Sequence, residues 1–200
     1  MSFLRSLATF FLETLETVVM ALLLFALSYI FAFQPHQVKG NSMLPNFFND
    51  EHLLTNKLVF LFRSPQRGDV IIFKAPDNPE YDYIKRIIGL PGDTIEVKES
   101  HFLVNNRAIN EAAYLPAGTL TKAGYYLHEG QKLVVPSNAY FVSGDNRGNS
   151  SDSRDFGPVP KKSIIGQAWL MYWPVNKLGI IKEMTYSFEE GSNSFPTTPL

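Results

Sequence analysis

The sequence predicts a mainly β protein that is tethered to a membrane by one N-terminal helix. Residues 18–33 read VVMALLLFALSYIFAF, an apolar run without a charged side chain. Extended back to residue 10, this run is long enough to cross a bilayer. After residue 33 the pattern changes to short β-branched and aromatic runs separated by glycine and proline. No long amphipathic helical pattern follows, so we expect the rest of the chain to consist of strands.

The apolar N-terminal region, which we assign to residues 1–34, has three interpretations. A permanent transmembrane anchor is favoured, with Glu13 and Glu16 near the interface, where charge is tolerated. A cleaved signal peptide would carry a small-x-small site after its apolar run, but residues 26–28 (Ala-Leu-Ser) lie inside it. A buried core helix is disfavoured because the segment is apolar all round and terminal. Positive charges on both sides give the orientation little bias.

Strand patterns divide the remainder into a core and an insertion. Asn105-Asn106 suits the positive φ angles of a type I′ turn, which makes one of these segments a hairpin. We expect a β core at residues 35–98 and 137–185, a small inserted β subdomain at 99–136, and a disordered polar tail at 186–200. The expected strands, with the hairpin fourth, are 69–73, 83–90, 94–97, 102–109, 132–135, 139–143 and 164–173.

Composition removes several classes of function. The chain has no cysteine, which excludes disulfides, thiolate metal sites and a cysteine nucleophile. Its formal net charge is −1, and nothing in that total points to a nucleic-acid partner. None of the four histidines pairs with another at the i, i+4 spacing of a helical metal site. We therefore expect neither a metal nor a cofactor.

Ser42 is the first residue that suggests chemistry. It lies in Gly40-Asn41-Ser42-Met43-Leu44-Pro45, nine residues after Phe33. Glycine and proline frame a turn that would project the hydroxyl from a rigid bend. A serine in such a turn is usually structural, so this segment alone does not identify a nucleophile.

Lys85 is the second such residue. In the strand at 83–90, alternation places Lys85 on one face and Arg86 on the other. An edge strand with two solvated cations is one reading. Alternatively, Lys85 is desolvated against apolar neighbours, and burial can lower a lysine pKa by up to about 3–5 units. Arg86 stays protonated in proteins, so any general base in this strand must be Lys85.

A polar loop at residues 143–154, SGDNRGNSSDSR, lies between apolar segments. Such a density of turn-forming residues is typical of a surface loop. Its position also favours a packed hydrogen-bond network in which Ser150 could orient a neutral lysine. The acids and bases that we expect to pair inside the loop are Asp145, Arg147, Asp152 and Arg154.

Taken together, these segments resemble the type I signal peptidases, a family of Ser–Lys serine proteases. The order is an anchor, GNSMLP, RGDV before a strand, YIKRIIGLPGD, and GDNRGNSSDSR. The resemblance covers roughly residues 15–175. A lysine-arginine pair followed by GLPGD, with the downstream loop, is highly specific to this family.

The resemblance implies a signal-peptidase-like β core and a set of site residues. Ser42 would be the nucleophile and Lys85 its general base, with an acyl-enzyme intermediate. Ser150 would hydrogen-bond the lysine, and Gly144 would form a backbone turn near it. Asp152 and Arg154 would be the ion pair that braces the site.

The resemblance also implies a substrate and a location. The substrate would be a signal-peptide-bearing preprotein cleaved after a small-x-small, Ala-x-Ala-like site, and we expect Met43 and Ile84 to line the P1 pocket. The enzyme would be a monomer anchored by a single span in the bacterial inner membrane, with its catalytic domain on the extracytoplasmic side. The lipid bilayer would then be its other partner.

Two positions depart from the family pattern. Gly40 has no hydroxyl where some members have a serine that helps the oxyanion hole, so the Ser42 N–H would need another donor beside it. Gly148 replaces an aspartate that is common in its box.

Two other readings remain open. One is a repressor-type self-cleaving Ser–Lys protease, against which the anchor and the Asp-Asn-Arg loop argue. The other is a membrane-anchored interaction protein without catalysis, against which the presence of both Ser42 and Lys85 argues.

Overall fold

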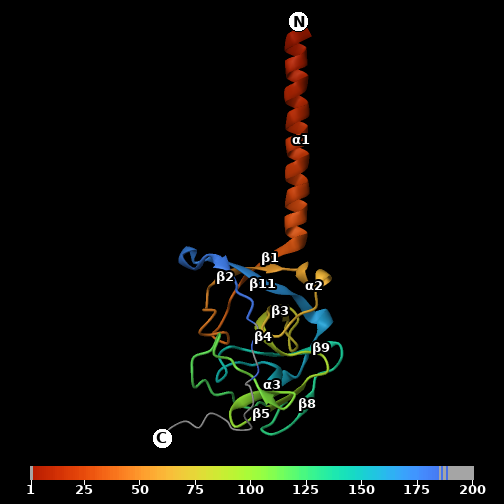
Figure 1. Cartoon of the computed structure of the whole chain (residues 1–200). Coiled ribbons are helices and arrows are strands. Elements are labelled where there is room, and N and C mark those ends of the chain that lie inside the picture. The colour runs from red at the N-terminus through yellow and green to blue at the C-terminus, as the bar shows by residue number, and fades with distance from the viewer. Residues whose placement is uncertain (1, 185, 187, 189–200) are drawn as a thin grey trace.

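The computed structural model describes residues 2–184, 186 and 188, and Figure 1 shows them as a β domain below one long helix. After one long helix, the regular elements are strands and single helical turns. They are α1 (Ser2–Ala32), β1 (Phe33–Gln37), β2 (His52–Asn56), α2 (Val59–Phe62), β3 (Val70–Lys74), β4 (Asp82–Gly89), β5 (Thr94–Lys98), β6 (His101–Val104), β7 (Arg107–Ala108), β8 (Leu133–Val134), β9 (Ala139–Ser143), α3 (Ser153–Phe156), β10 (Val159–Pro160), the 3₁₀ turn η1 (Lys161–Ser163), β11 (Ile164–Trp173), the 3₁₀ turn η2 (Val175–Lys177) and β12 (Gly179–Ile180).

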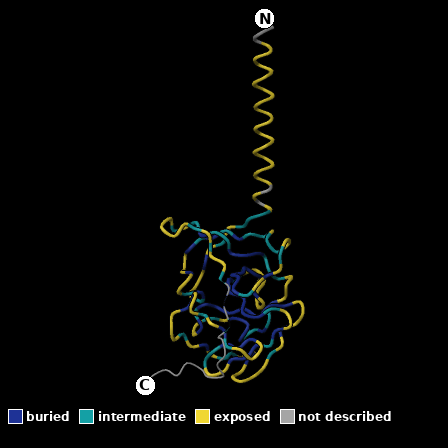
Figure 2. The backbone as a smooth tube through the Cα atoms, in the orientation of Figure 1, coloured by how far each residue is buried: buried dark blue, intermediate teal, exposed yellow. Residues whose placement is uncertain are grey.

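The helix α1 projects from the domain as a single straight rod (Figure 1). Within it, Arg5–Leu27 has a mean hydropathy of 2.0 in its most apolar part, and none of that part is buried by the rest of the protein (Figure 2). A soluble core helix would be mostly buried, so this feature fits the predicted membrane span better. The first residue after α1, Phe33, stacks on Trp169 of β11, which fixes the end of the helix to the sheet.

An eight-stranded antiparallel sheet forms the larger part of the domain. Its strand order is β1-β2-β11-β3-β4-β9-β10, and β12 pairs with β11. In this order β3 and β4 lie in the interior, and the last six residues of β4 are all buried. A strand covered on both faces is expected to be a continuous run of apolar residues. Lys85 and Arg86 interrupt that run, so each cation needs a partner inside the protein.

A second, four-stranded sheet has the order β7-β6-β5-β8. The turn from β6 to β7 has φ angles of +54° at Asn105 and +62° at Asn106, as the type I′ prediction requires. This sheet includes β5, which the sequence analysis placed in the β core at 35–98. The smaller sheet therefore spans Thr94 to Val134, beginning earlier than the expected insertion at 99–136.

Three apolar clusters fill the domain. The cluster beneath the serine turn, defined here as residues 40–47, contains Met43 and Phe47 with Leu53, Ile72 and Ile84. A second cluster lies between β4 and β9, and a third joins the small sheet to Phe141. Each fully buried side chain of this kind contributes about 1.5–3 kcal/mol to folding, so the turn is firmly seated on the core.

Most of the expected polar tail, 186–200, lies outside the described residues. Two of its residues are described: Tyr186 is buried against the small sheet, and Phe188 forms an isolated bridge with Ile109. The Tyr186 hydroxyl also donates to the carbonyl of Ile87, at 2.5 Å. The packed part of the chain therefore extends at least to Phe188.

Candidate active site

Ser42 lies in the serine turn, which follows β1 closely. Met43 is 1% exposed and acts as the apolar anchor of the turn, while Ser42 beside it remains half-buried at the surface of the core. The N–H groups of Asn46 and Phe47 both donate to the Met43 carbonyl, so the turn is also tied within itself. Packing and hydrogen bonds together hold the Ser42 hydroxyl in a defined direction.

Lys85 extends from the middle of β4 toward that hydroxyl. Its Nζ is 2.8 Å from Ser42 Oγ and donates a second hydrogen bond, of 3.1 Å, to the Ile84 carbonyl. The residue is only 4% exposed. The hydrogen-bond reach and the exclusion from water that the serine–lysine hypothesis requires are therefore both present.

The buried position changes the acidity of the lysine. Desolvation lowers the pKa of Lys85 from 10.5 to about 8, although the carboxylates of Asp152 and Asp145 act in the opposite direction. At pH 7 about one tenth of such lysines are neutral, compared with well under one in a thousand at the ordinary pKa. A neutral amine next to a hydroxyl can accept its proton, which is how a general base activates a nucleophile.

Ser150 does not take its predicted place at the lysine. No hydrogen bond joins Ser150 to Lys85; the Ser150 Oγ is buried and has no partner among the described residues. It lies instead against Gly144, where an added Cβ would approach Ser150 Oγ to 2.2 Å and the Ser42 carbonyl oxygen to 2.3 Å. Glycine is thus required at position 144 because the serine turn and the polar loop meet there.

The predicted ion pair of Asp152 and Arg154 forms at the base of the polar loop. Arg154 Nη2 is 2.7 Å from Asp152 Oδ2, and both side chains are buried. The same carboxylate accepts from the Gly144 N–H at 2.9 Å and from the Ser143 hydroxyl at 3.0 Å. Burial alone would raise the pKa of Asp152, but the hydrogen bond and charge of Arg154 outweigh it and lower the pKa. Asp152 therefore stays ionised and braces the loop.

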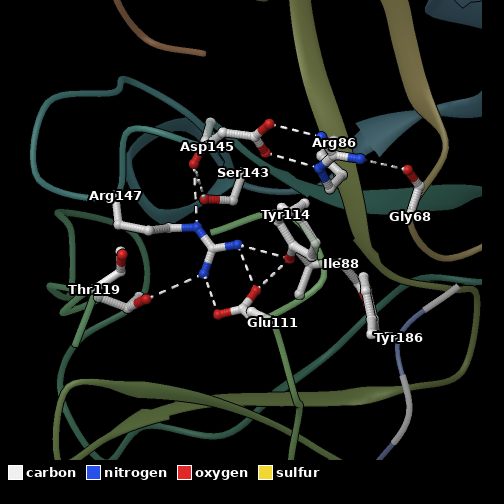
Figure 3. Close-up of polar contacts among 12 residues, drawn as sticks. Gly68, Arg86, Ile88, Glu111, Tyr114, Thr119, Ser143, Asp145, Arg147 and Tyr186 are labelled. Atoms are coloured by element: carbon white, nitrogen blue, oxygen red, sulfur yellow. Dashed lines mark hydrogen bonds and ion pairs between the residues drawn. The ribbon is translucent and has the colours of Figure 1, made fainter. Parts of the chain in front are cut away.

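The other two charged residues of the loop pair outside it, which corrects the expectation of purely internal pairs. Asp145 binds Arg86 of β4 through two hydrogen bonds of 2.7 and 2.6 Å, and Arg147 binds Glu111 of the inserted region (Figure 3). Lys85 and Arg86 thus serve opposite faces of one strand, as predicted by alternation. Glu111 was not predicted as a partner because it lies 36 residues from Arg147.

A cleft of about 610 Å³ opens beside Ser42 and Lys85. Near the serine its walls are apolar. They include Val38, Leu53, Ile72 and Ile84. Ile84 was expected to line a P1 pocket and does line this cleft, whereas Met43 lies beneath the turn in the core and does not.

Farther along β1 the cleft becomes polar. His36 Nε2 lies 3.1 Å from Asp82 Oδ2, and its Nδ1 lies 2.8 Å from the Thr55 hydroxyl. The contact between His36 and Asp82 was not predicted, because the two residues are 46 positions apart in the sequence. The cleft is therefore lined by apolar side chains beside the serine and by polar side chains toward the start of β1.

Comparisons with known proteins show which family the chain resembles. The signal peptidase, peptidase S26 family matches residues 11–173. Signal peptidase I S of Bacillus subtilis (strain 168) is 36% identical, over 84% of this chain and 91% of its own. Signal peptidase I P of Bacillus subtilis subsp. natto is 35% identical with the same coverage.

Signal peptidase I of Leptolyngbya laminosa is 33% identical, over 84% of this chain and 82% of its own. A crystal structure of a signal peptidase I from Enterococcus faecalis V583 is 31% identical, covers 52% of this chain and 97% of its own, and superposes with a TM-score of 0.41. The family match over most of the chain, together with the relatives from Bacillus subtilis and Leptolyngbya laminosa, establishes that the chain belongs to the signal peptidase family, peptidase S26, and is a signal peptidase of the serine protease type.

Proposed function

We propose that this signal peptidase works through a Ser42–Lys85 dyad, is anchored in the membrane by α1, and cleaves preproteins after a small-x-small site. The observation that carries the proposal is the 2.8 Å approach of a buried lysine amine to a serine hydroxyl. Membership of the family establishes signal-peptide cleavage by a serine protease. The dyad, the anchoring and the sequence preference are the proposed part.

In the proposed reaction the neutral Lys85 amine takes the proton of Ser42 as Oγ attacks the scissile carbonyl. The tetrahedral oxyanion would be stabilised by the Ser42 backbone N–H and a second donor, since Gly40 offers no hydroxyl. The protonated lysine then gives its proton to the leaving amine, leaving an ester on Ser42. Water activated by the same amine hydrolyses the ester and restores the hydroxyl.

The apolar end of the cleft supports the preference for small residues. Val38, Leu53, Ile72 and Ile84 surround the space beside Ser42. All four side chains are buried with little room to move, and overpacking such a wall costs about 1–3 kcal/mol. Alanine at positions −1 and −3 of a signal peptide would fit against this wall, whereas a large side chain at either position would not.

The exposed apolar surfaces support anchoring in a bilayer. Beyond α1, the large side chains of Leu61 and Phe62 in α2 and of Trp173 in β11 are more than half exposed. Figure 1 shows these elements at the same end of the domain as α1. A bacterial inner membrane with the domain on its extracytoplasmic side would bring Ser42, only ten residues from the end of α1, to the region where exported preproteins emerge.

Cleavage of a preprotein with an Ala-x-Ala site by the full-length enzyme in lipid vesicles tests the proposal. Ser42→Ala and Lys85→Ala are each expected to abolish cleavage, because they remove the nucleophile and its base. Ser137→Ala and Lys98→Ala change the same residue types at exposed positions away from the cleft and should cleave as the wild type does. Cleavage by either dyad variant at more than about one hundredth of the wild-type rate would contradict the proposed role of that residue.

A further inference from the structure

Arg147 is the largest fully buried side chain of the described residues, and a residue of the inserted region neutralises it. Its Nη1 and Nη2 donate to the two oxygens of Glu111 at 2.6 and 2.5 Å (Figure 3). Further bonds reach Thr121 Oγ1 at 3.1 Å, the Tyr114 hydroxyl at 3.0 Å and the Gly144 carbonyl at 3.1 Å. A guanidinium has five N–H donors, and these five hydrogen bonds satisfy all of them.

This pair lies one residue from a direct contact with the nucleophile. The backbone N–H of Asn146, next to Arg147, donates to the Ser42 carbonyl at 3.0 Å. The Asn146 side chain donates to the Asn41 carbonyl, also at 3.0 Å. Asn146 therefore connects Arg147, its neighbour in the polar loop, to the serine turn.

Tyr114 provides a second connection from the inserted region to the same turn. Its carbonyl and the carboxylate of Asp145 both accept from the Asn46 side chain, each at 2.8 Å. Its hydroxyl donates to Glu111, and the Arg86 guanidinium lies 4.2 Å from its ring centre (Figure 3). Glu111 and Tyr114 thus both contact the polar loop, and Tyr114 also contacts Arg86 of the strand that carries Lys85.

The arrangement depends on the charge of Glu111. Burial disfavours a charged Arg147, but the Glu111 carboxylate more than compensates, and the pKa of Arg147 is raised. Without that carboxylate the guanidinium would be buried and unpaired, a state that proteins avoid by moving the charge toward water. Moving Arg147 would shift Asn146 with it, and the Ser42 carbonyl would lose its donor.

We propose that Glu111 is a positioning residue for the proteolytic reaction: by pairing with Arg147 it holds the polar loop, and through Asn146 the serine turn, in register with Lys85. The inference rests on the proposed dyad. The inserted region would then support catalysis through the contact of Glu111 with Arg147, without a group that touches the substrate.

The test compares Glu111→Gln, which keeps the shape and removes the charge, with Glu111→Asp, which keeps the charge on a shorter side chain. Full-length enzymes in vesicles are assayed on a preprotein with an Ala-x-Ala site. We expect Gln to lower kcat about 10- to 100-fold with KM within twofold, because a small misplacement of reacting groups is costly. Asp should recover most of the loss, whereas a role in packing alone would make Gln the better substitute.

Asp93→Asn is the matched control. Asp93 is a buried carboxylate paired with Arg67 at 2.6 Å, and it also accepts from the Leu90 N–H and the Asn105 side chain, none of which belongs to the serine turn or the polar loop. It should lower the thermal midpoint without lowering kcat. A kcat for Glu111→Gln within twofold of the wild type, or no lower than that of Asp93→Asn, would overturn the proposal.

Two further measurements keep the outcome decisive. Tyr114→Phe removes only a hydroxyl; if Glu111→Gln does not fold, a lower kcat in Tyr114→Phe supports the proposal and an unchanged one contradicts it. Amide hydrogen exchange, which needs no activity, should be faster in Glu111→Gln at residues 41–47 and 144–149 and unchanged in β3. Unchanged exchange at residues 41–47 and 144–149 would contradict the positioning role of Glu111 alone. A wild-type enzyme that cleaves no preprotein would contradict the proposed function.

Discussion

The Lys85 amine loses affinity for its proton because the protein replaces most of the water around it. Desolvation brings its pKa down to about 8, and two carboxylates, Asp152 and Asp145, keep it from falling further. Those carboxylates are themselves engaged by Arg154 and Arg86, which weakens their pull on the lysine. At the residue scale, the chemistry of the site is therefore a balance between burial and paired charges.

Gly144 offers a test of how closely the polar loop meets the serine turn. Gly144→Ala would place a Cβ 2.2 Å from Ser150 Oγ and 2.3 Å from the Ser42 carbonyl oxygen, so backbone must move. We expect kcat/KM to fall by at least about tenfold, since the displaced backbone carries Ser42, the proposed nucleophile. Gly148→Ala in the same loop meets no atom within 4 Å and should have wild-type activity. Equal activity of the two variants in a preprotein assay would contradict the close approach.

The proximity of Ser42 and Lys85 could be predicted because short motifs carry them, but their environment could not. The side chain expected to orient the lysine, Ser150, points to Gly144 instead. Hydrogen-bond geometry depends on rotamers and on the packing of segments distant in sequence, and no local pattern records either. For the same reason the sequence showed a basic Arg147 without revealing its partner Glu111.

At the scale of elements, β4 carries both Lys85 of the proposed dyad and Arg86, which pairs with the polar loop. The pairing of Lys85 with Ile71 of β3 and of Ile87 with Val142 of β9 was not predictable, but the placement of Lys85 and Arg86 on opposite faces was. The alternation rule holds for any strand, whereas strand order depends on long-range pairing. The strands β1 and β2 were missed because their sequences, FQPHQ and HLLTN, lack the β-branched runs used to find the others.

A stability measurement tests the burial of Lys85 within β4. Its pKa is lower in the folded than in the unfolded state, so the charged lysine disfavours folding below about pH 8, and this penalty disappears as pH rises to 10.5. The shift corresponds to about 3 kcal/mol. Lys85→Met should therefore unfold in urea with a free energy that exceeds the wild-type value at pH 7, with the gap shrinking between pH 8 and 10.5. A gap that does not depend on pH would mean that the lysine is hydrated.

At the scale of the whole molecule, α1, the cleft and the serine turn form one chain of contacts. Phe33 connects α1 to the large sheet, β1 continues along the cleft, and the serine turn follows. The apolar helix and the β-rich domain could be predicted from hydropathy and turn residues. The boundary of the small sheet was less accurate, since β5 reads as a core strand and belongs to the smaller sheet only through its pairing with β6 and β8.

Removal of residues 1–32 tests what the anchor contributes. The truncated enzyme should cleave a short soluble Ala-x-Ala peptide with nearly the wild-type kcat/KM, because the site lies wholly beyond α1. Its rate on a preprotein inserted in vesicles should fall at least about 100-fold, because enzyme and substrate no longer share a surface. Equal losses on both substrates would instead indicate that α1 supports the fold of the domain.

The proposed mechanism depends above all on a lysine that is partly neutral at physiological pH, and the titration of that lysine can be observed directly. An NMR titration of the wild-type enzyme with ¹³C-labelled lysine, with Lys85 assigned by its absence in Lys85→Met, follows the ionisation of this one amine. We predict a midpoint at about 8, well below the ordinary 10.5. A midpoint near 10.5 would leave Ser42 without a base and would contradict the proposed mechanism.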